Sequence, residues 1–80
     1  MVSAYVEQYT IGKRGLMLIS MDGDIIIFHR ETISNLKIYK TEEGLVFEIK
    51  DTVGDTYKFV LADGELNNSD VKLLKELLVL

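Results

Sequence analysis

The sequence predicts a mainly β fold, a six-stranded antiparallel meander that forms a β-roll or a partly open barrel and ends in one C-terminal helix. Two observations support this prediction. Six glycines separate short apolar or alternating runs, which is the punctuation of an antiparallel meander. Near residue 69 the spacing of apolar residues changes from two to about 3.6, the period of a helix. With 80 residues, the chain suits one domain, which we expect to cover residues 1–80.

The first two predicted strands cover residues 2–10 and 16–21. Alternation along the first strand puts Tyr5 and Tyr9 together on one face. The sequence Gly12-Lys13-Arg14-Gly15 then turns the chain, because glycine tolerates the positive φ that tight turns demand. The second strand is apolar almost throughout, which is typical of a strand buried on both faces.

The third and fourth strands are predicted at residues 24–30 and 33–40. Asp22-Gly23, before the third strand, fits a two-residue hairpin of type I′, whose twist matches that of the flanking strands. Both faces of the third strand are apolar, and we assign the face of Ile25 and Ile27 to the core.

The fifth and sixth strands, at residues 45–50 and 56–61, have the clearest pattern of the chain. Apolar and polar residues alternate along both, so each strand has one apolar face and one mostly solvated face. A helix follows at residues 69–79, with Ser69 as its N-cap. A helix of about eleven residues is marginal alone in water, so we expect it to dock on the apolar face of the fifth and sixth strands. The predicted core lies on these inward faces: Leu18, Ile25, Ile27, Leu36, Ile38, Phe47, Ile49, Phe59, Leu61, Leu74 and Leu77.

This order of elements resembles that of pleckstrin-homology-like barrels, in which a meander ends in a C-terminal helix that covers one opening. The resemblance lies in the outline, and the sequence has one strand fewer than that superfamily. It implies that basic residues of the first hairpin contact lipid headgroups. Two other arrangements fit the same elements: an SH3-like roll with an added helix, and a flat sheet with one helix laid across it.

The composition excludes several classes of function. Nine Lys and Arg against 13 Asp and Glu give a net charge of −4, which disfavours binding to nucleic acid. The chain has no cysteine and one histidine, so we expect no disulfide, no metal and no cofactor. Its longest apolar runs are far below the ~20 residues that span a bilayer, and no signal peptide is visible. We therefore expect a soluble cytoplasmic protein.

His29 is the first candidate for catalysis, since histidine is the residue type that changes charge near neutral pH. General acid–base catalysis needs a partner within hydrogen-bond reach. Glu31 and Asp24 are the nearest acidic residues in the sequence, and neither forms a recognisable catalytic motif with His29. We therefore predict that the chain is not an enzyme, and an enzyme centred on His29 is kept as a distant alternative.

The acidic loop 63–70 has oxygen-bearing residues at alternate positions, as the start of an EF-hand requires. Asn68 stands where the turn glycine belongs, and Leu74 stands where the bidentate carboxylate belongs. We interpret the loop as a polar turn that leads to the helix.

Lys13 and Arg14 in the first turn are the best basic feature of the sequence. Adjacent cations between glycines can hold a phosphate through side chains and backbone N–H groups together. An anion- or lipid-headgroup-binding domain is therefore the alternative function, with Arg30 or Lys37 as further contributors.

The favoured interpretation is a small non-enzymatic protein-binding module, an adaptor or inhibitor with an unidentified protein partner. Tyr5 and Tyr9 are candidate interface residues, because tyrosine is enriched at interfaces. Val79 and Leu80 are further candidates, since the end of the helix is apolar all round. Apolar residues on both faces of the second and third strands also predict a homodimer, which would cover the face that a single layer leaves open.

Overall fold

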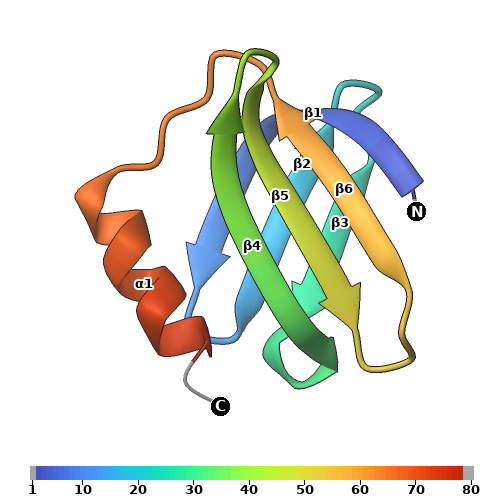
Figure 1. Cartoon of the computed structure of the whole chain (residues 1–80), viewed down its shortest axis with the longest axis vertical. Coiled ribbons are helices and arrows are strands. Elements are labelled where there is room, and N and C mark those ends of the chain that lie inside the picture. Colours follow the sequence, from blue (N-terminus) through green and yellow to red (C-terminus); the bar gives the residue numbers. More distant parts are fainter. Residues whose placement is uncertain (1, 79–80) are drawn as a thin grey trace.

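The computed structural model describes the backbone of residues 2–78 and the side chains of residues 4–74. This part of the chain folds into six strands and one α-helix (Figure 1). The strands are β1 (Val2–Gly12), β2 (Gly15–Ser20), β3 (Ile25–His29), β4 (Ile33–Thr41), β5 (Gly44–Asp51) and β6 (Thr56–Leu61), and the helix is α1 (Asn68–Leu78). A short 3₁₀ turn, η1 (Arg30–Thr32), joins β3 to β4. The predicted fold class, a mainly β roll with one C-terminal helix, is confirmed.

The strands form one open sheet in the order β3-β2-β1-β6-β5-β4. Of the five pairings in the described chain, four are antiparallel, whereas β1 and β6 run parallel. The sheet is therefore mixed, with two antiparallel meanders that join through the first and the last strand. The apolar pattern of a strand indicates its buried face but not the direction of its neighbour, so the sequence did not predict the parallel pair.

The sheet rolls up so that its two halves face each other (Figure 1). We call β1–β2–β3 the first half and β4–β5–β6 the second half. β1 connects them, because its residues 2–6 pair with β6 and its residues 8–12 pair with β2. β3 and β4 end the strand order, so the roll is open between them. The likeness to pleckstrin-homology-like barrels is limited to this outline, a partly open β-roll with one C-terminal helix.

A β-bulge in the middle of β1 decides where its tyrosines point. The register of β1 against β2 shifts between Val6 and Gln8, so one extra residue enters β1. Val6 and Tyr9 both point inward as a result, and Tyr9 packs on Phe47 with ring centroids 5.2 Å apart. Tyr5 lies on the outer face and is 57% exposed. The prediction that Tyr5 and Tyr9 share a face is wrong, because strict alternation ends at the bulge.

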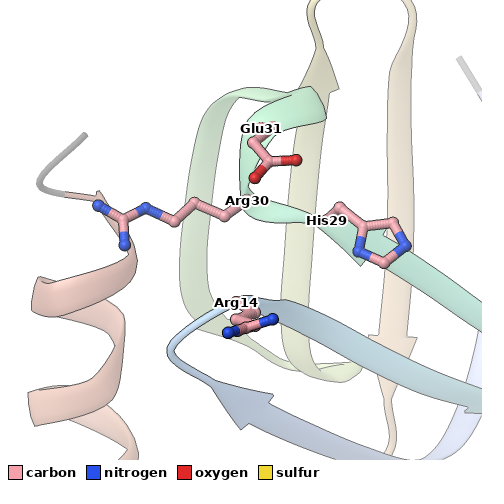
Figure 2. A pocket seen from close by; sticks show the side chains of 4 residues that line it. All are labelled: Arg14, His29, Arg30 and Glu31. Atoms are coloured by element: carbon pink, nitrogen blue, oxygen red, sulfur yellow. The ribbon is translucent and has the colours of Figure 1, made fainter.

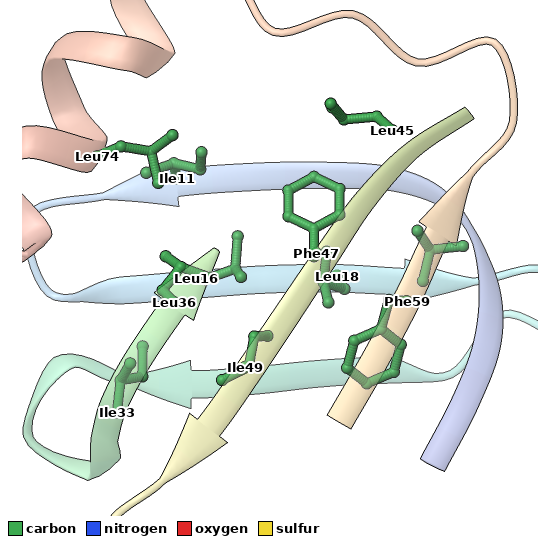
Figure 3. Packing of buried hydrophobic residues seen from close by; sticks show 11 residues of the cluster. Ile11, Leu16, Leu18, Ile33, Leu36, Leu45, Phe47, Ile49, Phe59 and Leu74 are labelled. Carbon is green, nitrogen blue, oxygen red and sulfur yellow. The ribbon is translucent and has the colours of Figure 1, made fainter. Parts of the chain in front are cut away.

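The core lies between the two halves of the roll (Figure 3). Phe47, Leu18 and Ile49 are fully buried, as predicted. Other predicted core residues are buried (Leu36, Phe59 and Leu74) or partly buried against the same cluster (Ile38 and Leu61), and the side chain of Leu77 lies outside the described residues. Alternation therefore predicted the inward faces of β4, β5 and β6 correctly.

The inward face of β3 is the reverse of the predicted one. Ile25 and Ile27 point outward and are 64% and 58% exposed. Ile26 and Phe28 point inward, and the centroid of the Phe28 ring lies 5.5 Å from that of Tyr57. The prediction failed because both faces of β3 are apolar, so alternation alone does not distinguish them.

The turn between β2 and β3 also differs from the predicted type I′ geometry. Residues 21–24 lie between the strands, and the Ser20 N–H donates to the Asp24 carbonyl at 2.8 Å, so the loop inside this pair has three residues, 21–23. The Gly23 N–H donates to the Ser20 carbonyl at 2.9 Å. Gly23 has a φ of 89°, whereas Asp22 lacks the positive φ that type I′ requires. A three-residue loop with one left-handed glycine therefore replaces the predicted two-residue turn.

Gly15 in the first turn is required for a different reason from the predicted one. Its φ lies outside the left-handed region. A Cβ at this position would lie 2.1 Å from the Phe28 carbonyl oxygen. Glycine therefore allows β3 to approach β2 closely, and the turn itself does not demand it.

The helix α1 has a different cap and a different docking site from those predicted. Oδ1 of Asn67 accepts a hydrogen bond from the Asp70 N–H at 2.8 Å, so Asn67 rather than Ser69 is the N-cap. Leu74 lies in the core beside Ile11 of β1 (Figure 3). The helix packs mainly on β1 instead of β5 and β6. The first half of the roll already covers the apolar face of β5 and β6.

Candidate binding site

The outer side of the first half carries a cluster of apolar side chains. Met17 and Ile19 of β2 stand beside Ile27 and Ile25 of β3, respectively, in the register of the sheet. The two β3 residues are largely exposed and the two β2 residues are half-buried. Met21, in the turn after β2, adds another exposed apolar side chain. We call Met17, Ile19, Ile25 and Ile27 the apolar outer face.

β3 is also an edge strand with open backbone groups. Among residues 2–78, it pairs with β2 on one side and with no strand on the other. Backbone hydrogen bonds to the β2 side at Asp24 (2.8 Å) and Arg30 (2.7 Å) show that even-numbered residues direct their N–H and C=O groups toward β2. Because the direction alternates along an antiparallel strand, Ile25, Ile27 and His29 direct theirs to the open side.

A hollow of about 290 Å³ continues the apolar outer face toward the first turn. Gly12 and Gly15 pair there and carry no side chains to fill it, and a Cβ on Gly12 would stand in open space. Met17, Ile27 and His29 are among the residues that line it. Its mostly apolar lining suits an apolar side chain of a binding partner.

A larger hollow of about 880 Å³ is lined, among the residues whose side chains are described, by Arg14, His29, Arg30 and Glu31 (Figure 2). The first turn, the end of β3 and η1 supply these residues. The Arg30 N–H donates to the Arg14 carbonyl at 2.7 Å, which brings the two arginines together. We call this the cationic hollow, because two guanidinium groups and one carboxylate belong to the part of its lining that the structure describes. Such a lining suits an anion.

The structure brings together part of the predicted anion site. Arg14 and Arg30 line the cationic hollow, while the neighbouring Lys13 is exposed outside its lining. Lys37 stands on the outer side of β4, opposite Glu48 in the register, and does not line this hollow. The sequence does offer one signal that Arg14 and Arg30 lie close together, which is the β2–β3 hairpin. A loop centred on residue 22 places position 14 opposite position 30.

The predicted interface residues have different environments. The Tyr5 hydroxyl is on the outer surface and donates to Oε2 of Glu43 at 3.4 Å. The Tyr9 hydroxyl is 3.0 Å from the Glu65 carbonyl oxygen and also meets the Asp70 carboxylate, so Tyr9 ties β1 to the start of α1. Burial, and then the Asp70 carboxylate, raise the pKa of Tyr9 to about 12. Val79 and Leu80 lie outside the described residues.

His29 lines both hollows, and one of its two predicted charged neighbours is near it. Glu31 shares the cationic hollow, whereas Asp24 lies at the opposite end of β3. Among the residues whose side chains are described, no three His, Asp or Glu groups gather in a way that could hold a metal ion. In the loop 63–70, two polar side chains serve the fold instead, because Asn67 caps α1 and Asp70 meets Tyr9.

No protein family, curated protein or solved structure matches this chain. Within the described range, no helix combines the length and apolar character needed to cross a membrane. Three features of the described structure bear on function: the apolar outer face, the open edge of β3 and the cationic hollow.

Proposed function

We propose that this chain is a small non-enzymatic protein-binding module, of adaptor or inhibitor type, that takes up an extended segment of a partner along β3. The observation that carries the proposal is the combination of an open edge strand with the exposed side chains of Ile25 and Ile27. The added segment would extend the sheet, and the partner would cover the apolar outer face.

The composition of β3 supports this function. Natural edge strands usually carry charged residues, proline or bulges that block pairing with another chain. The strand Ile25–His29 consists of four apolar residues and one histidine. Exposed apolar clusters are typical of interaction sites. Backbone hydrogen bonds from the odd-numbered residues would supply affinity, and contacts with alternate side chains would supply specificity.

The two hollows indicate the chemistry of the partner. The hollow over Gly12 and Gly15 accepts an apolar side chain next to the apolar outer face. Arg14 and His29 line both this hollow and the cationic hollow, so an acidic group fits at the same end of the surface. We therefore expect a partner segment with alternating apolar residues and an acidic group near one end.

Selection from a peptide-display library, with the whole chain as bait, tests this function. Enriched peptides should have apolar residues at alternate positions. Methylation of their alternate backbone nitrogens should abolish binding, because a methylated amide cannot donate to the edge of β3. Ile27→Lys should weaken binding at least about tenfold, as loss of a central contact does. Tyr39→Lys on the other edge strand is the matched control and should leave binding unchanged. Equal binding to Ile27→Lys and to the unsubstituted chain would contradict the proposal.

A second candidate function is the binding of a phosphate group in the cationic hollow. The observation in its favour is that Arg14 and Arg30, distant in sequence, line one hollow together with His29. The net charge of −4 acts against it. Titration with inorganic phosphate, and with vesicles that contain or lack a phosphoinositide, distinguishes a free anion from a lipid headgroup. Arg14→Ala should weaken binding more than Lys13→Ala does. Equal binding by the unsubstituted chain and by both variants would remove this candidate.

A further inference from the structure

We infer that the segment taken up by β3 is β3 of a second copy of this chain, in an antiparallel pair whose two-fold axis passes through Ile27. The inference rests on the protein-binding function proposed above and names its partner. Three features of β3 support it: the direction of its open backbone groups, the match of its side chains, and the charges at its two ends.

The open backbone groups suit a two-fold pair. Ile27 is the central residue of the five-residue strand, and its N–H and C=O groups point to the open side. When two copies pair about Ile27, these two residues exchange both hydrogen bonds, and Ile25 of each copy exchanges both with His29 of the other. This register pairs the whole strand, whereas a shift in either direction leaves part of it unpaired.

The side chains match in the same register. On the outer side, Ile27 of one copy meets Ile27 of the other, so the two apolar outer faces become continuous. On the inner side, Ile26 of each copy stands opposite Phe28 of the other, and both residues are half-buried in the single chain. Apolar residues therefore face each other on both sides of the new ladder, and such cross-strand pairs stabilise sheets.

The two ends of β3 carry opposite charges. Asp22 and Asp24 precede the strand, whereas Arg30 follows it, and at that end Arg30 and the neighbouring Arg14 outnumber Glu31. An antiparallel pair brings the acidic end of one copy to the basic end of the other, with Asp24 opposite Arg30 in the register about Ile27. A parallel pair would place like charges together, so the strand is complementary to itself in one orientation.

Even with the sheet rolled up, one side of β3 stays uncovered and available for a second copy. The roll covers the inner side of β3, where Ile26 and Phe28 pack against the core. It leaves Ile25 and Ile27 in solvent on the outer side. Two-fold association is the commonest way in which soluble chains cover such a surface.

Paired charge substitutions on the symmetry axis test the inference. Position 27 faces itself in the proposed dimer, so Ile27→Lys and Ile27→Glu should each weaken self-association at least about tenfold, because like charges stand directly opposite. A 1:1 mixture of the two variants should associate again, since lysine then faces glutamate. The matched control is a mixture of Ile25→Lys and Ile25→Glu. Position 25 faces His29, so this mixture should associate no better than its two components.

Sedimentation and light scattering over a wide range of micromolar concentrations measure the association, and circular dichroism confirms that each variant is folded. We expect the mass of a dimer for the unsubstituted chain. A monomeric mass with the fold intact would overturn the inference, and so would a dimer that the charges at position 27 leave unchanged. If the chain is monomeric while selected peptides still bind β3 and lose binding in Ile27→Lys, the second copy is excluded and the protein-binding function stands. If no peptide binds and no dimer forms, both are wrong.

Discussion

The two edge strands of the sheet, β3 and β4, differ in what they present to solvent. β4 carries Lys37 on its outer side, and its Lys40 forms an ion pair with Glu65. β3 carries Ile25 and Ile27 on its outer side. Both strands end the same sheet, so the difference lies in their residues and not in their place in the fold. Charged edges discourage pairing with another chain, which indicates that β3 is the edge available for contact.

The outer faces of the two halves differ in the same way. Val46 and Val60 of the second half point outward, yet they are only 1% and 6% exposed. They stand in one row of the sheet between the large residues Tyr39 and Tyr5. The next row alternates in charge across three strands, with Lys37, Glu48 and Lys58. An outward apolar residue is therefore buried where large or charged neighbours cover it, and the apolar outer face of the first half lacks such cover.

The largest expected effect comes from comparing two isoleucines on opposite sides of the sheet. Ile49→Ala should cost about 2–5 kcal/mol of unfolding free energy, because Ile49 is fully buried and its removal leaves a cavity. Ile25→Ala should cost less than about 0.5 kcal/mol, because that side chain is mostly in water. Urea unfolding of both variants below the concentration of any self-association measures the difference. Equal losses would mean that β3 turns its other face to the core.

Two glycines of the first turn provide the next comparison. Gly15→Ala should cost about 1–3 kcal/mol, because the new Cβ would stand 2.1 Å from the Phe28 carbonyl oxygen and push β3 away from β2. Gly12→Ala is the matched control and should change stability by less than about 0.5 kcal/mol, since its Cβ meets open space. Thermal unfolding of the two variants measures both effects. A Gly15→Ala variant as stable as Gly12→Ala would show that β2 and β3 are less closely packed than described.

The two tyrosines of β1 allow a third comparison, between the inner and outer sides of one strand. Tyr9→Phe should cost about 1 kcal/mol, because it removes the hydroxyl that meets Asp70 and Glu65, and partial exposure lowers the full value of a bond to a charged group. Tyr5→Phe should cost less than about 0.3 kcal/mol, since its hydroxyl makes one long, exposed contact. Chemical denaturation at neutral pH measures the two losses. A larger loss for Tyr5→Phe would contradict the bulge.

The same tyrosine predicts a dependence on alkaline pH. The folded-state pKa of Tyr9, about 12, is higher than its ordinary value of 10.0, because burial and the Asp70 carboxylate disfavour the phenolate. The stabilisation from the protonated hydroxyl is therefore complete below pH 10 and is lost as the pH rises from 10 toward 12. The difference in stability between the unsubstituted chain and Tyr9→Phe should shrink across this window. A constant difference up to pH 12 would show that the hydroxyl does not titrate as described.

Sequence patterns predicted those strands that have one apolar face. In β5 and β6, polar and apolar residues alternate, so Phe47 and Phe59 could be assigned to the core from the sequence. In β3 both faces are apolar, and the inner face depends on which residue meets Tyr57 across the roll. The bulge in β1 inserts one residue without any glycine or other sequence signal, so the inward position of Tyr9 could not be predicted.

The candidate site was predictable only in part, for a related reason. Arg14 was identified because it lies in a glycine turn, a local feature of the sequence. Its partners His29 and Arg30 depend on the register of the β2–β3 hairpin, which the loop at residues 21–23 determines. The hollow over Gly12 and Gly15 arises because two glycines, which have no side chains, pair across neighbouring strands. The apolar pattern of a single strand does not reveal such a pairing.

The smallest expected effect concerns the ion pair that stands at the edge strand β4. Lys40→Ala should lower the unfolding free energy by about 0–0.5 kcal/mol, because the side chains of Lys40 and Glu65 are 50% and 77% exposed and water screens their attraction. The effect should decrease further when salt is added. Glu65→Ala should give the same small loss, and the double variant should show a coupling near zero at high salt. Lys40→Ala should also leave the self-association of the chain unchanged, because β3 remains the more apolar edge. If Lys40→Ala strengthens self-association, both alone and combined with Ile27→Lys, the copies associate through β4 and not through β3.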